Sequence, residues 1–529
     1  MLLEVLAMPK KLQIYNVGSK GINTDVAPWD LPPEFISYGF NFKIFKNSIL
    51  SAGGYANWSS PPTEFQPGLL FPVKSESGYY WVVAGRSGVY AFDGSAWHNI
   101  SSGAYSGLGV NDEFNWTNCY LGQIPIINNP QHYPEYWSPA SPGQLLQPLN
   151  WSPGVTWQDR GITAKVIRSH KNFLFALNLQ DGADAQADSY RWSTAADING
   201  LPFTWDETDI SALAGVASLG GDGGEIIDGL SLRDSFCIYS SDSIDILDYT
   251  GDEFVWRRRE FSNTVGLLNK NCIAEVKGMH FFMTNGDIIM NDGNSLTPIL
   301  RGRLQRQFNS RINSNYYNRS FVTENVNSKE IWFCVPQEGT DYPSVAYVYN
   351  WIDDSWAVRD LPPDTAFASY GLEMQAPLIW SGWGGTWDSQ LSQWSSNNSV
   401  LLDSSVIGIT RNPAQLKLIE PKEQRDSGDL MSIIERTDYP LEGVNDASTL
   451  VKLYPHIRGT NPVSIQVGSQ QIAGGPISWK PAQTFTPGVD RKLDVRTTGL
   501  LHAWRISSIG TGNWEFSGMD LEYEDTGVR

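Results

Sequence analysis

One unit of sequence recurs along the middle of this chain, and it restricts the fold more than any other feature. Each copy has a short run of β-branched and aromatic residues, a turn rich in Gly, Asp or Asn, and a second run that ends near a tryptophan. The clearest copy is YYWVVAGRSGVYAFDGSAWHNIS, residues 79–101, in which Asp93-Gly94 follows an apolar run. Asp-Gly beside apolar runs is a strong signal for a β-hairpin.

Seven copies can be identified, and they begin near residues 79, 118, 173, 236, 279, 331 and 377. Their spacing of roughly 40–60 residues is typical of propeller blades or solenoid turns. Each copy supplies at least two strands, and four-stranded blades closed around an axis leave only short, protected sheet edges. We therefore predict an all-β fold with a β-propeller of six to eight blades. A pair of ordinary β-sandwiches is the alternative.

One segment, residues 299–317, breaks the β pattern. Four apolar residues recur there every fourth position and would share one face of a helix of about four turns; they are Leu300, Leu304, Phe308 and Ile312. The rest of the helix surface carries the densest basic cluster of the chain: Arg301, Arg303, Arg306 and Arg311. The pattern predicts one short amphipathic helix inserted in the propeller.

After about residue 395 the tandem pattern stops and the apolar runs lengthen. Residues 448–459 and 461–471 alternate apolar and polar positions, as half-buried antiparallel strands do. Residues 500–510 and 514–525 predict a final hairpin around Gly510-Thr511-Gly512. The expected organisation is an N-terminal extension that docks on a C-terminal β-sandwich-like platform domain, with the propeller between them: residues 1–60, 398–529 and 61–397, respectively.

The charge of the chain restricts its partners. With 38 Lys and Arg against 57 Asp and Glu, the net charge is −19. Such a chain repels phosphate backbones as a whole, so tight DNA binding is not expected, whereas passage of DNA without adhesion is favoured. The four cysteines have no C-x-x-C spacing and are expected to be buried free thiols. No run of 18 apolar residues predicts a membrane span.

The sequence offers no constellation for catalysis, metal ligation or cofactor binding. The six histidines have no ligand spacing, and there is no HExxH, GxSxG or Walker loop. The acids of residues 240–253, among them Asp245 and Asp248, are interpreted as solvated loop acids, and the expected partners of Arg257–Arg259 are such neighbouring loop acids. Trp383 and Trp387 could stack on a sugar, although buried structural aromatics are the more ordinary explanation.

Residues 21–35, GINTDVAPWDLPPEF, are polar and broken by three prolines, yet they include several large apolar side chains. Such a segment usually lies extended on a surface, because proline fixes φ before docking. We expect it to pack on the C-terminal domain or on an adjacent subunit, with Trp29 as the anchor.

The same segment carries a resemblance to a known family. Gly21-Ile22-Asn23-Thr24-Asp25, Leu31-Pro32, Asn41-Phe42 and Gly53-Gly54 resemble the beginning of tail proteins from short-tailed bacteriophages. The family glycine of the following hairpin turn is replaced by Asn47, a residue that tolerates left-handed backbone. Residues 266–312, 345–362 and 499–529 resemble later parts of the family, so the resemblance spans nearly the whole chain.

Members of this family are tail nozzle or tail hub proteins, and the resemblance implies a fold and a function. It implies a propeller attached to a platform domain, and a ring, usually sixfold, that continues the DNA channel below the portal and adaptor. The ring also anchors tail fibres or tailspikes. The chain would then be a virion structural protein of the phage tail, made in the host cytoplasm, and not an enzyme.

The partners expected on this basis are further copies in a homohexamer, an adaptor or portal-side tail protein, and tail fibres or tailspikes. Genomic DNA would pass during ejection without tight binding. The candidate residues for the ring or adaptor interface are Trp29, Arg301, Arg303, Arg306 and Arg311. The alternative is a carbohydrate-binding or glycan-cleaving propeller that recognises host surface polysaccharide through Trp383 and Trp387.

Overall fold

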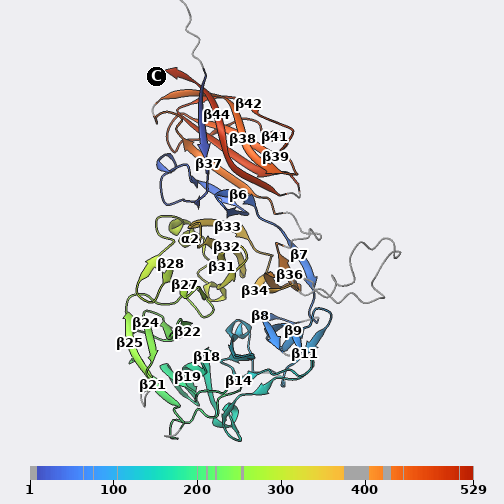
Figure 1. Cartoon of the computed structure of the whole chain (residues 1–529), viewed down its shortest axis with the longest axis vertical. Helices are drawn as coiled ribbons and strands as arrows, with labels where there is room; N and C mark the ends of the chain where they lie inside the picture. Colours follow the sequence, from blue (N-terminus) through green and yellow to red (C-terminus); the bar gives the residue numbers. More distant parts are fainter. Residues whose placement is uncertain are drawn as a thin grey trace, which may run out of the picture. The chain divides into compact units, whose positions relative to one another are not determined.

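A computed structural model of the chain is shown in Figure 1. It describes residues 9–527 apart from 63–64, 76, 104, 106, 199, 210–211, 221–222, 252–254, 374–403, 421–429, 445 and 511–512. The chain divides into two compact units, each built from separate stretches of sequence. Unit 1 comprises Met1–Ala56, Gly286–Pro362 and Glu420–Arg529, and unit 2 comprises Asn57–Asn285 and Pro363–Ile419. The domain boundaries expected from the sequence are a different partition and stay a prediction.

Unit 2 contains four-stranded antiparallel sheets that follow one another along the chain (Figure 1). The first comprises β8 (Pro67–Ser75), β9 (Gly78–Gly85), β10 (Val89–Phe92) and β11 (Trp97–Asn99). The second comprises β12 (Thr117–Leu121), β13 (Ile124–Asn129), β14 (His132–Tyr136) and β15 (Gln147–Pro148). The small pair β16 (Asn150–Ser152) and β17 (Val155–Thr156) and the short helix α1 (Trp157–Arg160) follow them.

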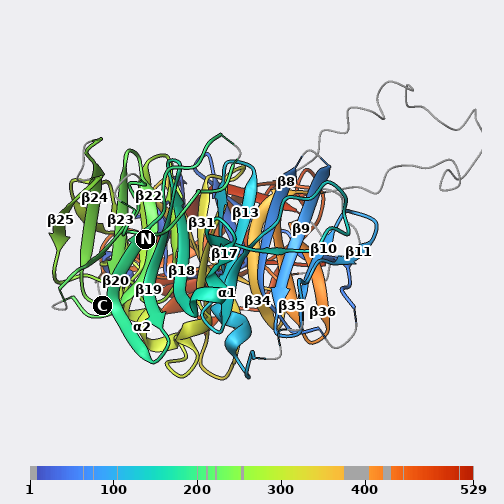
Figure 2. The same cartoon turned by 90° about the horizontal axis from the view of Figure 1, so that it is seen from below.

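The third and fourth sheets have the same plan. The third comprises β18 (Ile162–His170), β19 (Phe173–Asp181), β20 (Asp184–Trp192) and β21 (Gly215–Ser218). Its first three strands lie side by side in Figure 2. The fourth comprises β22 (Ile226–Leu232), β23 (Ser235–Ser240), β24 (Ile244–Tyr249) and β25 (Trp256–Ser262). The hairpin β26 (Ile273–Val276) and β27 (Met279–Met283) comes next in this unit.

The cores of neighbouring sheets are shared, which is the packing of propeller blades. Val82 of the first sheet belongs to one apolar cluster with Ile127 of the second sheet and with Trp116, which directly precedes that sheet. Cys119 of the second sheet clusters with Ile167 of the third. The third and fourth sheets share a further cluster that includes Phe175 and Phe236, whose rings stack 4.3 Å apart. Burial of large aromatic and β-branched side chains between sheets is the main stabilising contribution here.

The last sheet of unit 2 joins distant parts of the chain. It comprises β34 (Thr365–Leu372), β35 (Ser404–Arg411), β36 (Ala414–Ile419) and β7 (Tyr55–Ser59). β34 packs against β8, and Phe367 contacts the apolar cluster of the first sheet. A strand that precedes the first blade in the sequence therefore completes the last blade, so that the two ends of the propeller sequence are joined. The seventh repeat expected at residue 377 lies outside the described residues.

Unit 1 contains the remaining propeller sheet, with β30 (Phe321–Asn325), β31 (Glu330–Pro336), β32 (Pro343–Asn350) and β33 (Ser355–Asp360). The N-terminal segment lengthens this sheet by β2 (Gly21–Ile22) and β3 (Phe35–Ile36), which pair in parallel. The hairpin β28 (Ile288–Asn291) and β29 (Leu296–Pro298) and the helix α2 (Gln305–Arg311) also belong to unit 1. β26, β27, β28 and β29 together form one four-stranded sheet. Over the described residues, the fold is thus an all-β propeller of seven sheets: six have four strands, and β30–β33 is extended to six by β2 and β3.

The rest of unit 1 is a β-sandwich-like domain of two sheets. One has the order β42 (Leu493–Gly499), β38 (Ala447–Gly459), β44 (Trp514–Gly527), β6 (Ser48–Ser51), β5 (Phe42–Phe45), with β1 (Lys10–Tyr15) paired to β44. The other has the order β4 (Tyr38–Phe40), β37 (Ile433–Tyr439), β43 (Leu501–Ser508), β39 (Val463–Gln470), β40 (Ser478–Trp479), with β41 (Gln483–Phe485) paired to β39.

Two expectations about local structure are wrong. β43 and β44 do not form a hairpin, because they belong to different sheets; the Trp504 and Phe516 rings meet 5.7 Å apart between them. The helix expected to have about four turns has seven residues. Gly302 has φ +73°, a left-handed conformation that an α-helix does not contain, and Ile312 is already extended. The apolar face was nevertheless identified, since Leu300, Leu304 and Phe308 are fully buried.

Candidate functional site

The segment Gly21–Asp25 docks on unit 1 through nearly every one of its residues. Gly21 has φ +78° and pairs with Trp356 of β33. A Cβ at this position would lie 1.8 Å from the Trp356 carbonyl oxygen, so only glycine fits without rearrangement. Ile22 is buried, and the backbone N–H of Asn23 donates to the Ile36 carbonyl at 3.1 Å. Backbone contacts of Gly21 and Asn23 therefore hold this segment on unit 1.

The side chain of Asn23 completes this docking. Its Oδ1 accepts hydrogen bonds from the backbone N–H groups of Asp25 and Val26, both at 3.1 Å, in a local Asx turn. Its Nδ2 donates to the Gly302 carbonyl at 3.0 Å. The Thr24 N–H donates to the Arg303 carbonyl at 2.8 Å. One buried amide thus holds both its own turn and the segment that leads into α2.

Asp25 caps α2 from a position 280 residues away in the sequence. Its Oδ2 accepts from the Gln305 N–H at 3.1 Å, and its Oδ1 accepts from the Arg306 N–H at 3.0 Å. The residue at the N-cap position, Leu304, makes no side-chain cap. An α-helix leaves its first N–H groups without intrahelical partners and favours negative charge at that end. The resemblance segment and the basic helix, predicted separately, are therefore one site.

The four arginines of this region have different environments. Arg301 pairs with Asp287 at 3.5 Å, and burial raises the pKa of that carboxyl above its usual value. Arg303 lies over the Phe35 ring and pairs with Asp354 at 2.9 Å. The side chains of Arg306 and Arg311 are exposed and make no ion pair with any residue that the structure describes. Arg303 is thus held within the fold, Arg301 is largely exposed in spite of its ion pair, and Arg306 and Arg311 are exposed without one among the described residues.

The proline-rich part of the segment packs against strands of the sandwich. Pro28–Asp30 form one 3₁₀ turn between extended residues, so the segment is not extended throughout. Trp29 is half-buried, and its ring lies against Gly474. Leu31 is buried, and its carbonyl accepts a hydrogen bond from the buried guanidinium of Arg436. Desolvation by burial lowers the pKa of Arg436 to about 10, although the nearby Tyr439 and Asp438 act in the opposite direction.

Other residues of the resemblance also have identifiable roles. Asn41 has φ +57° and is buried; its side chain bonds Asp360 through both the carboxylate, at 2.9 Å, and the backbone N–H, at 2.7 Å. Asn47 has φ +64° in the β5–β6 turn, as expected for a residue in place of glycine. These asparagines adopt left-handed backbone at positions where most side chains are disfavoured.

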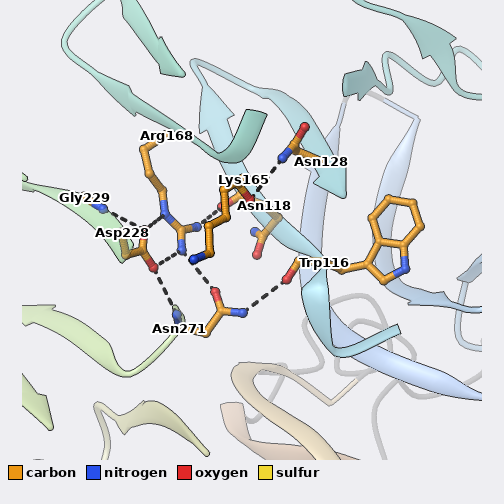
Figure 3. A network of polar contacts seen from close by, with 8 residues as sticks. All are labelled: Trp116, Asn118, Asn128, Lys165, Arg168, Asp228, Gly229 and Asn271. Carbon is orange, nitrogen blue, oxygen red and sulfur yellow. Dashed lines mark hydrogen bonds and ion pairs between the residues drawn. The ribbon is translucent and has the colours of Figure 1, made fainter. Parts of the chain in front are cut away.

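A second polar network lies in unit 2 and is shown in Figure 3. Arg168 of β18 makes a two-pronged ion pair with Asp228 of β22, with both N···O distances 2.7 Å. It also donates to the Asn118 carbonyl of β12 at 2.5 Å. Asn271, next to β26, accepts from Arg168 at 3.0 Å and donates to the Trp116 carbonyl at 3.1 Å. Four successive sheets are tied together by these contacts.

The acids beside Arg257–Arg259 were misplaced by the sequence interpretation. Asp245 and Asp248 lie on β24 and not in a loop. Asp245 is buried and pairs with Arg258 at 2.8 Å, and burial raises the pKa of its carboxyl. Asp248 pairs with Arg259 at 3.0 Å. Strand pairing between β24 and β25 brings these charges together, and a single sequence does not reveal which strands pair.

Other expectations concern sites and cysteines. Trp383 and Trp387, the possible sugar-stacking residues, lie outside the described residues. In the part of the chain that the structure describes, no group of three His, Cys, Asp or Glu could hold a metal ion. No helix of that part is long and apolar enough to cross a membrane. The four cysteines are buried and free, as expected.

Comparison with known proteins gives only distant similarity. No protein-family model matches the chain, and no curated protein matches it. Solved structures that resemble it include the Pan2 WD40 domain of Neurospora crassa, at 6% identity over 72% of this chain and 98% of that one, with a TM-score of 0.38. A putative 6-phosphogluconolactonase from Bacteroides uniformis is similar at 11% identity over 67% of this chain and 92% of that one, with a TM-score of 0.37. An exo-β-1,3-galactanase from Phanerochaete chrysosporium is similar at 10% identity over 89% of this chain and 100% of that one, with a TM-score of 0.27.

Proposed function

We propose that this protein is a ring-forming structural subunit of a short-tailed phage tail, a nozzle or hub that continues the DNA channel and anchors fibres or tailspikes. The observation that carries the proposal is the docking of Gly21–Asp25, the most distinctive part of the resemblance, on the helix that presents Arg306 and Arg311. The proposed ring is a homohexamer, and the proposed partners are further copies, an adaptor or portal-side protein and tail fibres or tailspikes.

The charge distribution supports a protein partner for this helix. Arg306 and Arg311 are exposed and unpaired within the described structure, while the chain as a whole has a net charge of −19. Rings are built from heterologous contacts in which one surface meets a different one on the next copy. A basic helix on one copy fits an acidic surface on the next, and such complementarity orients and accelerates association.

The proposal assigns the DNA conduit to the ring and not to a single propeller. Arg168, Asp228 and Asn271 connect four successive sheets through direct hydrogen bonds. Sheets whose side chains hydrogen-bond directly to one another leave no room for a DNA duplex between them. An acidic ring wall would let DNA pass without adhesion, because neutralising phosphates requires cationic side chains.

Charge reversal tests the proposed role of the helix. The double variant Arg306→Glu/Arg311→Glu should abolish ring assembly, measured as particle mass in solution, and leave the melting temperature within experimental error. Lys74→Glu, an exposed reversal on β8 of unit 2, is the matched control and should assemble normally. If the double variant forms rings at the same protein concentration as the wild type, the interface role is contradicted. A change in DNA retention by otherwise normal rings would instead indicate a DNA contact.

A further inference from the structure

A polar cavity of about 540 Å³ lies in unit 2 beside the network of Figure 3. It is lined from three successive regions: Asn115 and His132 at the second sheet, Lys165 and Asn178 on the third, and Lys270 before β26. Cavities that hold small molecules have volumes of about 300–1,000 Å³, so this one has room for a ligand. Neither the proposed tail function nor any residue already discussed accounts for it.

Lys270 is a buried cation without a counter-ion. Its side chain lines the cavity, it is 5% exposed, and its Nζ donates to Asn115 Oδ1 at 2.5 Å. No carboxylate lies within ion-pair distance of it among the described residues. Burial, followed by the nearby charge of Lys165, lowers the pKa of Lys270 to about 8. A buried charge with only a neutral amide partner is costly, and a bound anion would remove that cost.

The neighbouring cations have carboxylate partners, whereas Lys270 has none within ion-pair distance among the described residues. Arg168 is neutralised by Asp228. Lys165 pairs with Glu225 at 2.8 Å, and the Glu225 side chain is half exposed, so this pair can reorganise around a ligand. Around the two lysines the cavity wall provides amides, a hydroxyl and one phenol, from Asn115, Gln131, Tyr133, Thr163, Asn178 and Gln180. These groups hydrogen-bond hydroxyls without regard to charge.

We propose that this cavity binds a small hydroxylated anion, such as a sugar acid or sugar phosphate, with its anionic group on Lys270 and Lys165 and its hydroxyls on the amide-lined wall. The inference stands on the cavity and the uncompensated lysine, and it does not depend on the tail function.

Calorimetric titration of the full-length protein with three probes tests the proposal. Glucuronate supplies the carboxylate, glucose 6-phosphate supplies the phosphate, and glucose has the hydroxyls alone. At least one anionic probe should bind saturably at one site per chain, and glucose should bind at least about tenfold more weakly, since a charge-assisted hydrogen bond is worth about that much. Whichever anion binds more tightly identifies the natural anionic group. Equal binding of glucose, or no saturable binding of either anion, would overturn the proposal.

Variants locate the site. Lys270→Met fills the same space without charge and should weaken binding of the anionic probe by at least about tenfold. Lys165→Gln, a partly exposed position, provides a second variant with little risk to folding. Lys74→Gln, exposed and remote from the cavity wall, is the matched control and should bind as the wild type does. Undiminished binding by both Lys270→Met and Lys165→Gln would show that the anion binds elsewhere and would refute the assignment.

Discussion

The Arg168 network in unit 2 and the N-terminal docking site in unit 1 both join parts of the chain that are far apart in sequence. They do so through different kinds of contact. The Arg168 network uses a buried ion pair between side chains, supported by two backbone carbonyls and one amide. The N-terminal segment is held mainly by backbone hydrogen bonds, one Asx turn and a carboxylate cap.

The two kinds of contact predict different responses to unfolding. A buried ion pair is all-or-none, since loss of one partner leaves the other charged and desolvated. Backbone docking and a helix cap are sums of modest terms, each worth about 1 kcal/mol. We therefore expect the propeller sheets of unit 2 to unfold together and the N-terminal segment to detach locally.

The largest effect is expected from breaking the ion pair. Arg168→Met should lower the free energy of unfolding by about 3–5 kcal/mol, because it leaves Asp228 buried without a cation. Urea denaturation followed by tryptophan fluorescence measures this. The double variant Arg168→Met/Asp228→Leu should recover most of the loss. If the single variant is as stable as the double one, the network does not act as a unit.

The next largest effect is expected at Lys270, which has no ion pair among the described residues, whereas Arg168 is paired with Asp228. The pKa of Lys270 is lowered to about 8 in the folded chain, so between pH 8 and 10.5 the unfolded chain binds the extra proton. The contribution of Lys270 to the free energy of unfolding must then rise with pH across that window. Relative to Lys270→Met, the wild type should gain about 2–3 kcal/mol between pH 7 and 10. A pH-independent difference between the two proteins would contradict this.

A smaller, local effect is expected at the docking site. Asp25→Ala should destabilise α2 and the N-terminal segment by about 1–2 kcal/mol, the usual worth of a helix cap. Hydrogen exchange of residues 305–311 should quicken, while exchange in β18–β20 should not change. Asp30→Ala, another acid of the same segment with no cap to lose, is the matched control. Equal protection of α2 in Asp25→Ala and wild type would show that the cap is dispensable.

The smallest effect is expected at the exposed end of the site. Arg306→Glu and Arg311→Glu break no ion pair with a described residue and should change the free energy of unfolding by less than about 0.5 kcal/mol. Thermal unfolding of the dissociated subunit measures it. A loss above about 1 kcal/mol would mean that these arginines stabilise the fold and would remove the reason for assigning them to an interface.

The sequence predicted the repeated architecture because hairpin turns and tryptophans are local signals. It predicted the buried face of Leu300, Leu304 and Phe308 for the same reason, although Gly302 shortened the helix. Contacts between distant residues were not predictable: nothing local to Asp25 indicates that it caps a helix 280 residues away. The Arg168–Asp228 pair, the burial of Asp245 and the sheet change between β43 and β44 depend on strand pairing, which a single sequence does not encode locally.

If the proposed function is right, copies of this chain close into a ring with a channel. Mass measurement of the purified full-length protein over a range of concentrations, with negative-stain images of the same samples, tests it most directly. We expect a particle several times the mass of one chain, with rotational symmetry, most simply sixfold, and a central opening. Monomers at every concentration, with no ring in the images, would contradict it.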